Sequence, residues 1–345
     1  MSTPSPRAEQ PRGAPDSRVT ARDRLARFPR VRLVLRPTPL HRAPRLSREL
    51  GVPVVFKRDD LAGVGLGGNK LRGLEYILAD LRARGCDSLV TGAGPQSNWT
   101  MLAALAALRY RIEPHVVCYG SAAASEGNMR LLRWLGVDVQ FTGNPDRPSV
   151  DAGIEAVAAG LHAQGRRPYP VPRGGATPLG ALGYIRASVE LAAQLNSLGE
   201  QPSALWTATG SGGTQAGLVV GAALTGAGYQ VVGVTVSRTV ADSRARVREL
   251  AAGAAELAGM DVVLGEPNIL GGWIGPGYGQ PSPEGQAAAR LVATAEGVFL
   301  DPVFGAKAMA ALIAECRAGR ARGTQVFLVS GGAPAQFAGP PDLLP

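Results

Sequence analysis

The chain has 345 residues, of which 45% are hydrophobic and 18% are charged, with 46 glycines and a formal net charge of +9. This composition is typical of a globular protein with many tight turns, and the length allows about two domains. No apolar run reaches the roughly 18 residues that span a bilayer, and the first residues lack the apolar segment of a secretory signal. We therefore expect a cytoplasmic protein with no membrane partner.

The cysteines, histidines and arginines argue against a disulfide framework, a metal site and a nucleic-acid partner. Cys86, Cys118 and Cys316 lie far apart, and the three histidines have no ligand spacing, so neither a disulfide framework nor a zinc or iron site is expected. The arginines are spread along the chain without a basic stripe interleaved with aromatic residues. Solubility or phosphorylated small molecules explain the positive charge more simply than a nucleic-acid partner.

Short β-branched segments alternate with longer helical patterns from about Val31 onwards. Residues 1–30 are rich in Pro, Ser and Arg, and we expect this basic segment to be disordered. The predicted strands are 54–56, 88–91, 115–119, 137–141, 204–209, 231–236 and 325–329. The predicted helices are 71–81, 99–109, 126–135, 150–164, one from about 183 to 198, 215–224, 243–258, 283–296 and 307–318. This alternation predicts an α/β fold of open parallel sheets with flanking helices.

A stretch rich in Pro and Gly at 172–183 is the best internal boundary and suggests one sheet domain interrupted by a smaller one. We place the large domain at residues 31–72 and 180–338 and the small domain at residues 73–179, followed by a tail at 339–345.

Lys70 ends the motif Gly67-Gly68-Asn69-Lys70, in which a glycine-rich turn runs directly into a predicted helix. A lysine attacks a carbonyl only as the neutral amine, so a catalytic lysine needs its ammonium form destabilised. The positive end of a helix supplies part of that effect. The alternative is an ordinary solvated lysine on a loop.

The segment Thr209-Gly210-Ser211-Gly212-Gly213-Thr214-Gln215 follows a predicted strand and opens a predicted helix. Free backbone amides, close approach at the glycines and two hydroxyls would make a cradle for one phosphate. The segment lacks the third glycine of the dinucleotide motif and the Gly-Lys-Ser/Thr ending of the triphosphate loop. A tight strand-to-helix turn remains the alternative.

Two further loops carry polar side chains at ends of strands. Gln96-Ser97-Asn98 precedes a helix, where Ser97 or Asn98 either caps the helix or helps to hold a substrate carboxylate. Ser330 ends the last predicted strand. Ligands of open parallel sheets bind at this edge. A lysine, a phosphate cradle, a carboxylate cradle and no metal site point together to pyridoxal 5'-phosphate as the cofactor.

These motifs resemble the D-cysteine desulfhydrase and 1-aminocyclopropane-1-carboxylate deaminase family of pyridoxal-phosphate enzymes. The resemblance runs from about Pro37 to Pro334. It includes Lys57-Arg58-Asp59-Asp60, Gly67 to Lys70, Gln96-Ser97-Asn98, Gly210 to Gly217, Gly277-Tyr278-Gly279, Asp301-Pro302-Val303 and Gly331-Gly332. It implies the two-domain fold of tryptophan-synthase-β-like enzymes (fold type II), usually as a homodimer.

The resemblance also implies roles for individual residues. Lys70 would hold the cofactor as a Schiff base and then move the α-proton, while Ser97 and Tyr278 complete the catalytic set. The residues implied to bind the cofactor besides Lys70 are Asn98, Gly210, Ser211, Gly212, Gly213, Thr214 and Ser330. The residues implied to contact the substrate are Gln96, Ser97, Trp99, Tyr278 and Phe304.

Three positions depart from the family pattern. Phe304 replaces a typical tyrosine and loses its hydroxyl, and Gly305 replaces the acid of the ring-opening deaminases, so cyclopropane ring opening is disfavoured. Trp99 replaces a polar contact beside the substrate with a flat apolar wall, unless it simply packs in the core.

The sequence thus predicts a lyase acting on a small β-substituted amino acid similar to D-cysteine. Loss of the β-substituent would give an aminoacrylate that hydrolyses to a keto acid and ammonia. A biosynthetic β-replacement enzyme is the alternative, a cyclopropane deaminase ranks behind it, and a non-catalytic cofactor-binding protein is the contrasting class.

Overall fold

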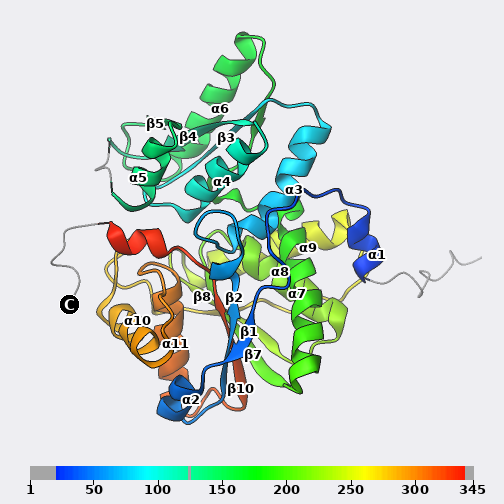
Figure 1. Cartoon of the computed structure of the whole chain (residues 1–345), viewed down its shortest axis with the longest axis vertical. Coiled ribbons are helices and arrows are strands. Elements are labelled where there is room, and N and C mark those ends of the chain that lie inside the picture. The colour runs from blue at the N-terminus through cyan, green and yellow to red at the C-terminus, as the bar shows by residue number, and fades with distance from the viewer. Residues whose placement is uncertain (1–20, 123–125, 339–345) are drawn as a thin grey trace, which may run out of the picture.

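A computed structural model describes residues 21–122 and 126–338. These residues form two stacked lobes, each built around its own sheet (Figure 1). The larger sheet has the order β1-β2-β10-β7-β8-β9 and the smaller has the order β5-β4-β3-β6. The large-sheet strands are β1 Leu40–Arg42, β2 Val54–Arg58, β7 Pro202–Thr209, β8 Gln230–Thr235, β9 Asn268–Leu270 and β10 Thr324–Val329. The small-sheet strands are β3 Ser88–Ala93, β4 Glu113–Cys118, β5 Asp138–Phe141 and β6 Pro168–Pro170.

All strand pairs except β1 with β2 are parallel. The central strands are covered on both faces, and every residue of β3 is buried. Strands that are buried on both faces read as continuous apolar runs, which is why periodicity located them. The predicted α/β fold with parallel sheets is confirmed. Because the strands are parallel, their carboxyl ends meet at one edge of each sheet.

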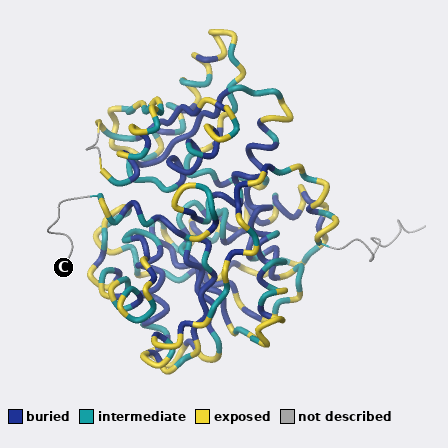
Figure 2. Tube along the Cα trace, viewed as in Figure 1, coloured by how far each residue is buried: buried dark blue, intermediate teal, exposed yellow. Residues whose placement is uncertain are grey.

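The helices flank both sheets, and the buried residues lie inside the two lobes (Figure 2). Their bounds are α1 Ala21–Ala26, α2 Pro44–Leu50, α3 Lys70–Ala83, α4 Asn98–Arg109, α5 Gly127–Trp134, α6 Ser149–Ala163, α7 Pro178–Leu198, α8 Gly213–Thr225, α9 Val240–Leu257, α10 Pro283–Glu296 and α11 Gly305–Arg317. The α7 and α10 helices show the expected signals, with a capping Thr or Ser, proline in the first turn and a left-handed glycine at the end.

The chain passes between the two sheets through α3 and α7, which cross in close contact. A Cβ on Gly183 would lie 2.3 Å from the carbonyl oxygen of Arg72, and a Cβ on Gly73 would lie 3.0 Å from that of Gly180. Glycine is therefore needed where the two backbones meet. The domain boundaries predicted at 72/73 and 179/180 fall at this crossing, and they stay a prediction.

Several short elements differ from the sequence expectation. The strands β1, β6 and β9 have three residues each, too few for an alternating pattern, and α2 was not predicted either. The α7 helix begins at Pro178, before the predicted 183. Part of the segment predicted to be disordered forms α1, because Leu25 is buried against Tyr76, Leu182 and other apolar side chains. The rest of that segment, residues 1–20, and the tail at 339–345 lie outside the described residues. Among the described helices, none combines the length and apolar content needed to cross a membrane.

Candidate active site

Two adjoining pockets lie where the strand ends of both sheets meet. The main pocket is lined by Asn69, Lys70, Ala93, Gly94, Ser97, Asn98, Trp99, Tyr119, Arg147, Arg173, Gly174, Ala208, Gly210, Ser211, Arg238, Tyr278, Phe304 and Ser330. The side pocket is lined by Asn69, Lys70, Gly73, Trp99, Gly174, Gly175, Ala176, Thr177, Gly180, Ala181, Tyr184, Ser211, Gly213 and Thr214. Lys70, Trp99 and Ser211 belong to both, so the lysine stands at the junction of the two pockets.

The turn that carries Lys70 is held from two sides. Gly68 N–H donates to the carbonyl of Asp59 over 2.9 Å, and Asn69 N–H donates to the carbonyl of Ser330 over 2.9 Å. Gly67 has φ 71°, and a Cβ there would lie 1.8 Å from the Asp60 carbonyl oxygen, so only glycine fits. The turn therefore fixes the start of α3 relative to the end of β10.

Burial lowers the pKa of Lys70 to about 8, while the carboxylate of Asp301 raises it and so opposes part of the shift. A larger fraction of the amine is therefore neutral near neutral pH than for a solvated lysine. This is the property that covalent chemistry requires, and it argues against an ordinary loop lysine.

A buried ion network adjoins this turn through Asp59, whose carbonyl accepts from the Gly68 amide. Its members are Lys57, Asp59, Arg72, Glu190 and Thr38. Arg72 donates to both carboxylate oxygens of Asp59 over 2.7 Å and to Glu190 over 3.0 and 3.2 Å. Lys57 Nζ donates to Glu190 over 2.5 Å and to the Thr38 carbonyl over 2.9 Å. The Asp59 and Arg72 side chains have no exposed surface. The network therefore joins β2, α3 and α7.

The glycine-rich segment forms an open cradle at the start of α8. No side chain caps this helix, and Gly212 takes the left-handed conformation with φ 93°. The amides of the first turn thus lack a capping partner, as an anion site requires. Thr214 Oγ1 accepts a hydrogen bond from Asn69 Nδ2 over 3.0 Å, which leaves its own hydrogen free to donate.

The second loop combines both alternatives considered from the sequence. Ser97 caps α4, since its Oγ accepts from the amides of Trp99 and Thr100, and it also lines the main pocket. Because Oγ accepts twice, its hydrogen remains available to a ligand. Asn98 Oδ1 accepts from Asn128 Nδ2 over 2.7 Å, so the Asn98 amide points its donor group the other way, beside Gly332.

Gln96 is not brought into either pocket. Its Oε1 accepts from the amide of Asn128 over 2.9 Å, and its Nε2 donates to the carbonyl of Glu126 over 3.1 Å. Gln96 thus holds the start of α5 together with Asn128, a fully buried residue that sequence reasoning missed. Asn128 lies on a helix face with no motif around it, so only its buried position reveals its part in orienting Asn98.

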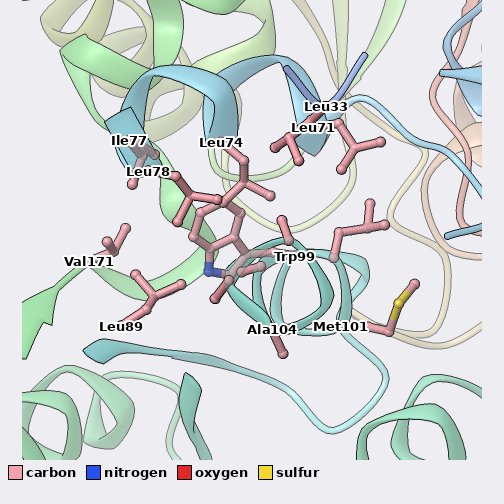
Figure 3. Packing of buried hydrophobic residues seen from close by; sticks show 14 of the residues in the cluster. Leu33, Leu71, Leu74, Ile77, Leu78, Leu89, Trp99, Met101, Ala104 and Val171 are labelled. Atoms are coloured by element: carbon pink, nitrogen blue, oxygen red, sulfur yellow. The ribbon is translucent and has the colours of Figure 1, made fainter. Parts of the chain in front are cut away.

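Trp99 packs in the core of the small lobe and also lines both pockets. The side chain is 3% exposed, its Nε1 donates to Thr91 Oγ1 over 2.8 Å, and it lies among Leu74, Leu78 and neighbouring apolar residues (Figure 3). A Cβ on Gly175 would lie 2.4 Å from the indole, so the ring is stacked directly on that backbone. Trp99 is therefore a core residue that also forms a pocket wall.

Tyr278 and Phe304 form the aromatic side of the main pocket. Their ring centroids lie 6.2 Å apart in an edge-to-face arrangement. The Tyr278 loop is held by Lys307, a fully buried cation that donates to the carbonyls of Ile274 and Gly277 over 2.7 and 3.1 Å. Burial raises the pKa of Tyr278 although nearby arginines act in the opposite direction. Its hydroxyl therefore stays protonated near neutral pH and can donate a proton or hydrogen bond.

Asp301 anchors the loop that carries Phe304. Its carboxylate accepts from the amides of Val303, Phe304 and Gly305 over 3.1, 2.7 and 2.8 Å. Burial raises the pKa of Asp301 to about 6, while these amide donors lower it. The carboxylate is thus ionised at neutral pH and exerts its field on Lys70.

Sequence reasoning missed Tyr119, Arg147, Arg173 and Arg238, which all line the main pocket. Each of these four residues follows the carboxyl end of a parallel strand, β4, β5, β6 and β8 respectively. The same strand-end rule that located the other loops would have pointed to them. No motif surrounds them, and one of the strands, β6, was not predicted at all.

Comparisons with known proteins fit this geometry. A family model described as pyridoxal-phosphate dependent enzyme matches residues 31–331. A D-cysteine desulfhydrase of Klebsiella pneumoniae (strain 342) is 40% identical over 333 residues, covering 92% of this chain and 98% of the relative. A protein of Pyrococcus abyssi (strain GE5 / Orsay), provisionally named 1-aminocyclopropane-1-carboxylate deaminase, is 38% identical over 313 residues, covering 91% and 94%.

Solved structures give the same result. A crystal structure of an ACC deaminase homologue has a TM-score of 0.88 and 35% identity, covering 92% of this chain and 96% of that one. The processed form of threonine deaminase isoform 2 from Solanum lycopersicum has a TM-score of 0.65 and 20% identity, covering 90% and 82%, and supports the fold alone. The family, the fold and the cofactor expected from the sequence are confirmed.

Proposed function

We propose that the main pocket of this chain, which belongs to the family of pyridoxal-phosphate-dependent enzymes, binds a small β-substituted amino acid related to D-cysteine. The chain is a pyridoxal-phosphate-dependent lyase that acts by elimination. The proposal concerns its substrate and the roles of its residues. The observation that carries it is Lys70, an amine of lowered pKa at the junction of a phosphate-sized cradle and a pocket with substrate-binding donors.

The donor groups at this junction fit the cofactor. The uncapped start of α8 and the Thr214 hydroxyl would hold its phosphate, since both offer donors and the described residues that line the side pocket include no Asp or Glu. Asn98 would donate to its ring oxygen, because Asn128 already occupies the Asn98 acceptor. Ser330 would lie at the ring nitrogen, and Lys70 would bind the aldehyde. When bound, pyridoxal phosphate supplies that aldehyde and an electron-poor ring that stabilises negative charge on the substrate α-carbon.

The other residues divide the work at the substrate. Ser97 donates its free hydroxyl hydrogen to the α-carboxylate, because its oxygen already accepts from two amides. Lys70 Nζ removes the α-proton. Tyr278, held protonated by burial, donates toward the departing group. Trp99 and Phe304 exclude water with apolar surface on two sides of the pocket.

Elimination suits this pocket better than ring opening. Phe304 offers no hydroxyl for proton transfer, and Gly305 offers no acid beside the cofactor ring. A Cβ on Gly305 would lie 3.1 Å from Asp301 Oδ2, so an acid there would stand against a carboxylate that is already buried. We therefore expect no ring opening of 1-aminocyclopropane-1-carboxylate.

The test is keto acid and ammonia release by purified protein loaded with pyridoxal phosphate, using D- and L-cysteine and both enantiomers of β-chloroalanine. Release from at least one of them is expected, with no product from 1-aminocyclopropane-1-carboxylate. Lys70→Ala and Lys70→Arg should both lose covalently held cofactor and activity, the latter because arginine keeps the charge but cannot form the Schiff base. No product from any amino acid would refute the assignment and favour a non-catalytic binder.

Other expectations from the sequence stay predictions. They are the homodimer, the cytoplasmic location and, as the alternative to hydrolysis, β-replacement. A thiol nucleophile added to the assay distinguishes the last of these, since replacement would divert product from keto acid to a new amino acid.

A further inference from the structure

Three arginines from separate loops converge on the main pocket. Arg147 precedes α6, Arg173 begins a short turn before α7, and Arg238 lies between β8 and α9. The Arg147 guanidinium lies 4.0 Å from the centroid of the Tyr278 ring, and Arg238 donates to the carbonyl of Gly210. Arg147 therefore lies beside a residue proposed to face the substrate, and Arg238 lies beside a residue proposed to hold the cofactor.

The three cations are poorly neutralised. Among the described residues that line the main pocket there is no Asp or Glu. Within the described ranges, the carboxylate that pairs with this group is Asp151, which lies 3.3 Å from Arg173 Nη2 and is 46% exposed, while Arg173 Nη1 is buried without a hydrogen-bond partner. Burial, and then repulsion from Arg147 and Arg173, lowers the pKa of Arg238. Like charges held together without acids indicate a site shaped for an anion.

The phosphate cradle does not account for all three arginines. Gly213 and Thr214, at the uncapped start of α8, line the side pocket, which none of the three arginines lines. Gly210 and Ser211, which complete the proposed cradle, line the main pocket, and Arg238 donates to the Gly210 carbonyl. Arg238 therefore adjoins the cradle, whereas Arg147 lies against Tyr278. The α-carboxylate is proposed to bind Ser97. A substrate with a thiol or another neutral side chain would leave the three guanidinium groups without a counter-charge.

We propose that the substrate carries a second anionic group on its β-carbon, either a free sulfonate or a phosphate ester. Arg147, Arg173 and Arg238 bind this group. This proposal rests on the proposed elimination and specifies its leaving group. Lys70 removes the α-proton, and the bond from the β-carbon to sulfur or to the ester oxygen breaks. Both electrons leave with the group, as sulfite or phosphate. Water then gives the keto acid and ammonia, without an oxidant or reductant.

The arginines would act most strongly in the bond-breaking step. The leaving group gains one negative charge as its bond breaks, so guanidinium groups around it stabilise the transition state more than the bound substrate. Tyr278, which lies under Arg147, would not need to supply a proton to such a stable anion.

The test compares anionic and neutral β-substituents on the holoenzyme. Both enantiomers of 2-amino-3-sulfopropanoate and of O-phosphoserine are assayed beside both enantiomers of β-chloroalanine. We expect kcat/KM to be at least about tenfold higher for an anionic member, and the sulfonate and ester arms tell which class is used. Sulfite or inorganic phosphate should inhibit β-chloroalanine turnover competitively.

Single substitutions Arg147→Met, Arg173→Met and Arg238→Met should each lower kcat/KM for the anionic substrate by about tenfold to a hundredfold. Turnover of β-chloroalanine should fall by a smaller factor, because its chlorine carries negative charge only as the bond breaks and not in the bound substrate, and inhibition by the free anion should weaken. The matched control is Arg248→Met, an arginine in an exposed pair with Glu266, which should alter neither. Cofactor content and thermal melting verify that each variant is folded and loaded.

Three outcomes would overturn the proposal. If β-chloroalanine releases keto acid at least as efficiently as the anionic substrates, the inference is wrong and the proposed elimination stands. If the arginine variants instead lose pyridoxal phosphate and all substrates equally, the arginines serve the cofactor. If no substrate releases keto acid, the proposed function fails and this inference fails with it.

Discussion

The protein holds two groups of cations near Lys70, and it neutralises their charges to different extents. In the buried ion network, Arg72 and Lys57 are matched by Asp59 and Glu190, with contacts of 2.5 to 3.2 Å. Among the described residues, one carboxylate pairs with the pocket arginines Arg147, Arg173 and Arg238, namely Asp151, and it contacts Arg173 alone. The first group is closed to solvent and has its charges paired internally, whereas the second opens on a pocket.

This difference distinguishes charges that stabilise the fold from charges that bind a ligand. A buried charge without a partner costs several kcal/mol, so a network with no access for ligands must pair its charges within the protein. Cations that line a pocket can lack a carboxylate partner in the protein, because a ligand or water interacts with them instead. Arginine content alone does not carry this information, since both groups look alike in the sequence, and the placement of the acids distinguishes them.

The sharpest way to break the comparison is to remove one arginine from each group. Arg72→Met should lower the free energy of unfolding of the cofactor-free protein by about 3–5 kcal/mol, because Asp59 and Glu190 are left buried with one fewer partner. Arg147→Met should change it by less than about 0.5 kcal/mol, since no acid in the described part of the chain pairs with Arg147 and it repels Arg238. Urea unfolding measures both values. Equal losses would mean that the pocket arginines belong to the framework as well.

Lowering the pH should weaken the buried ion network before it affects the main pocket. Arg72 holds the pKa of Asp59 and of Glu190 below the usual 3.8 and 4.5, against the effect of burial. A carboxyl whose folded pKa is lowered stabilises the protein above its unfolded pKa, and this is lost as pH falls through the folded value. The cofactor-free protein should therefore lose stability below about pH 4.5 in part through this pair.

The control for the acid experiment is Arg72→Met. In this variant, the loss of stability that Asp59 and Glu190 cause at low pH should be smaller. Arg147→Met should follow the original curve, because Asp59 and Glu190 keep their partner. An undiminished slope in Arg72→Met would show that other carboxyl groups account for the acid sensitivity.

Lys307 is an intermediate case, a fully buried cation paired only with backbone carbonyls among the described residues. Lys307→Met should fill similar volume but release the carbonyls of Ile274 and Gly277, and so loosen the loop of Tyr278. We expect KM to rise about tenfold with a smaller change in kcat, and stability to fall by about 1 kcal/mol. Steady-state kinetics on the best substrate measure the split. A loss confined to stability, with KM unchanged, would show that Lys307 does not position Tyr278.

The sequence was most informative where chemistry follows a motif. Lys70, Ser97 and part of the segment 209–215 line the pockets, because the strand and the helix around each motif are long enough to be recognised. The residues of that segment that line a pocket are Gly210, Ser211, Gly213 and Thr214. Gln96 has the same kind of neighbours, yet it faces Asn128, since its direction depends on how α5 packs. No local pattern contains that information.

The pocket arginines mark the other limit of sequence reasoning. Arg173 follows β6, a strand of three residues with proline at both ends, which periodicity does not detect. Arg147 and Arg238 follow strands that were predicted, but an arginine in a polar loop looks like any exposed residue. Only the meeting of both sheet edges shows that they surround one cavity.

The smallest effect expected concerns Asp301, whose carboxylate acts on the pKa of Lys70. Burial, opposed by the Asp301 carboxylate, lowers the pKa of Lys70 to about 8, so Asp301→Asn should lower that pKa further. In the cofactor-free protein, modification of Lys70 by an amine-reactive probe should then reach its half-maximum at a lower pH. Peptide mass spectrometry separates Lys70 from Lys57, which serves as an internal control because burial and the charges of Glu190, Asp59 and Arg72 shift its pKa. A midpoint that stays in place or moves upward would mean that the Asp301 carboxylate does not act on Lys70, and that the amine owes its state to burial alone.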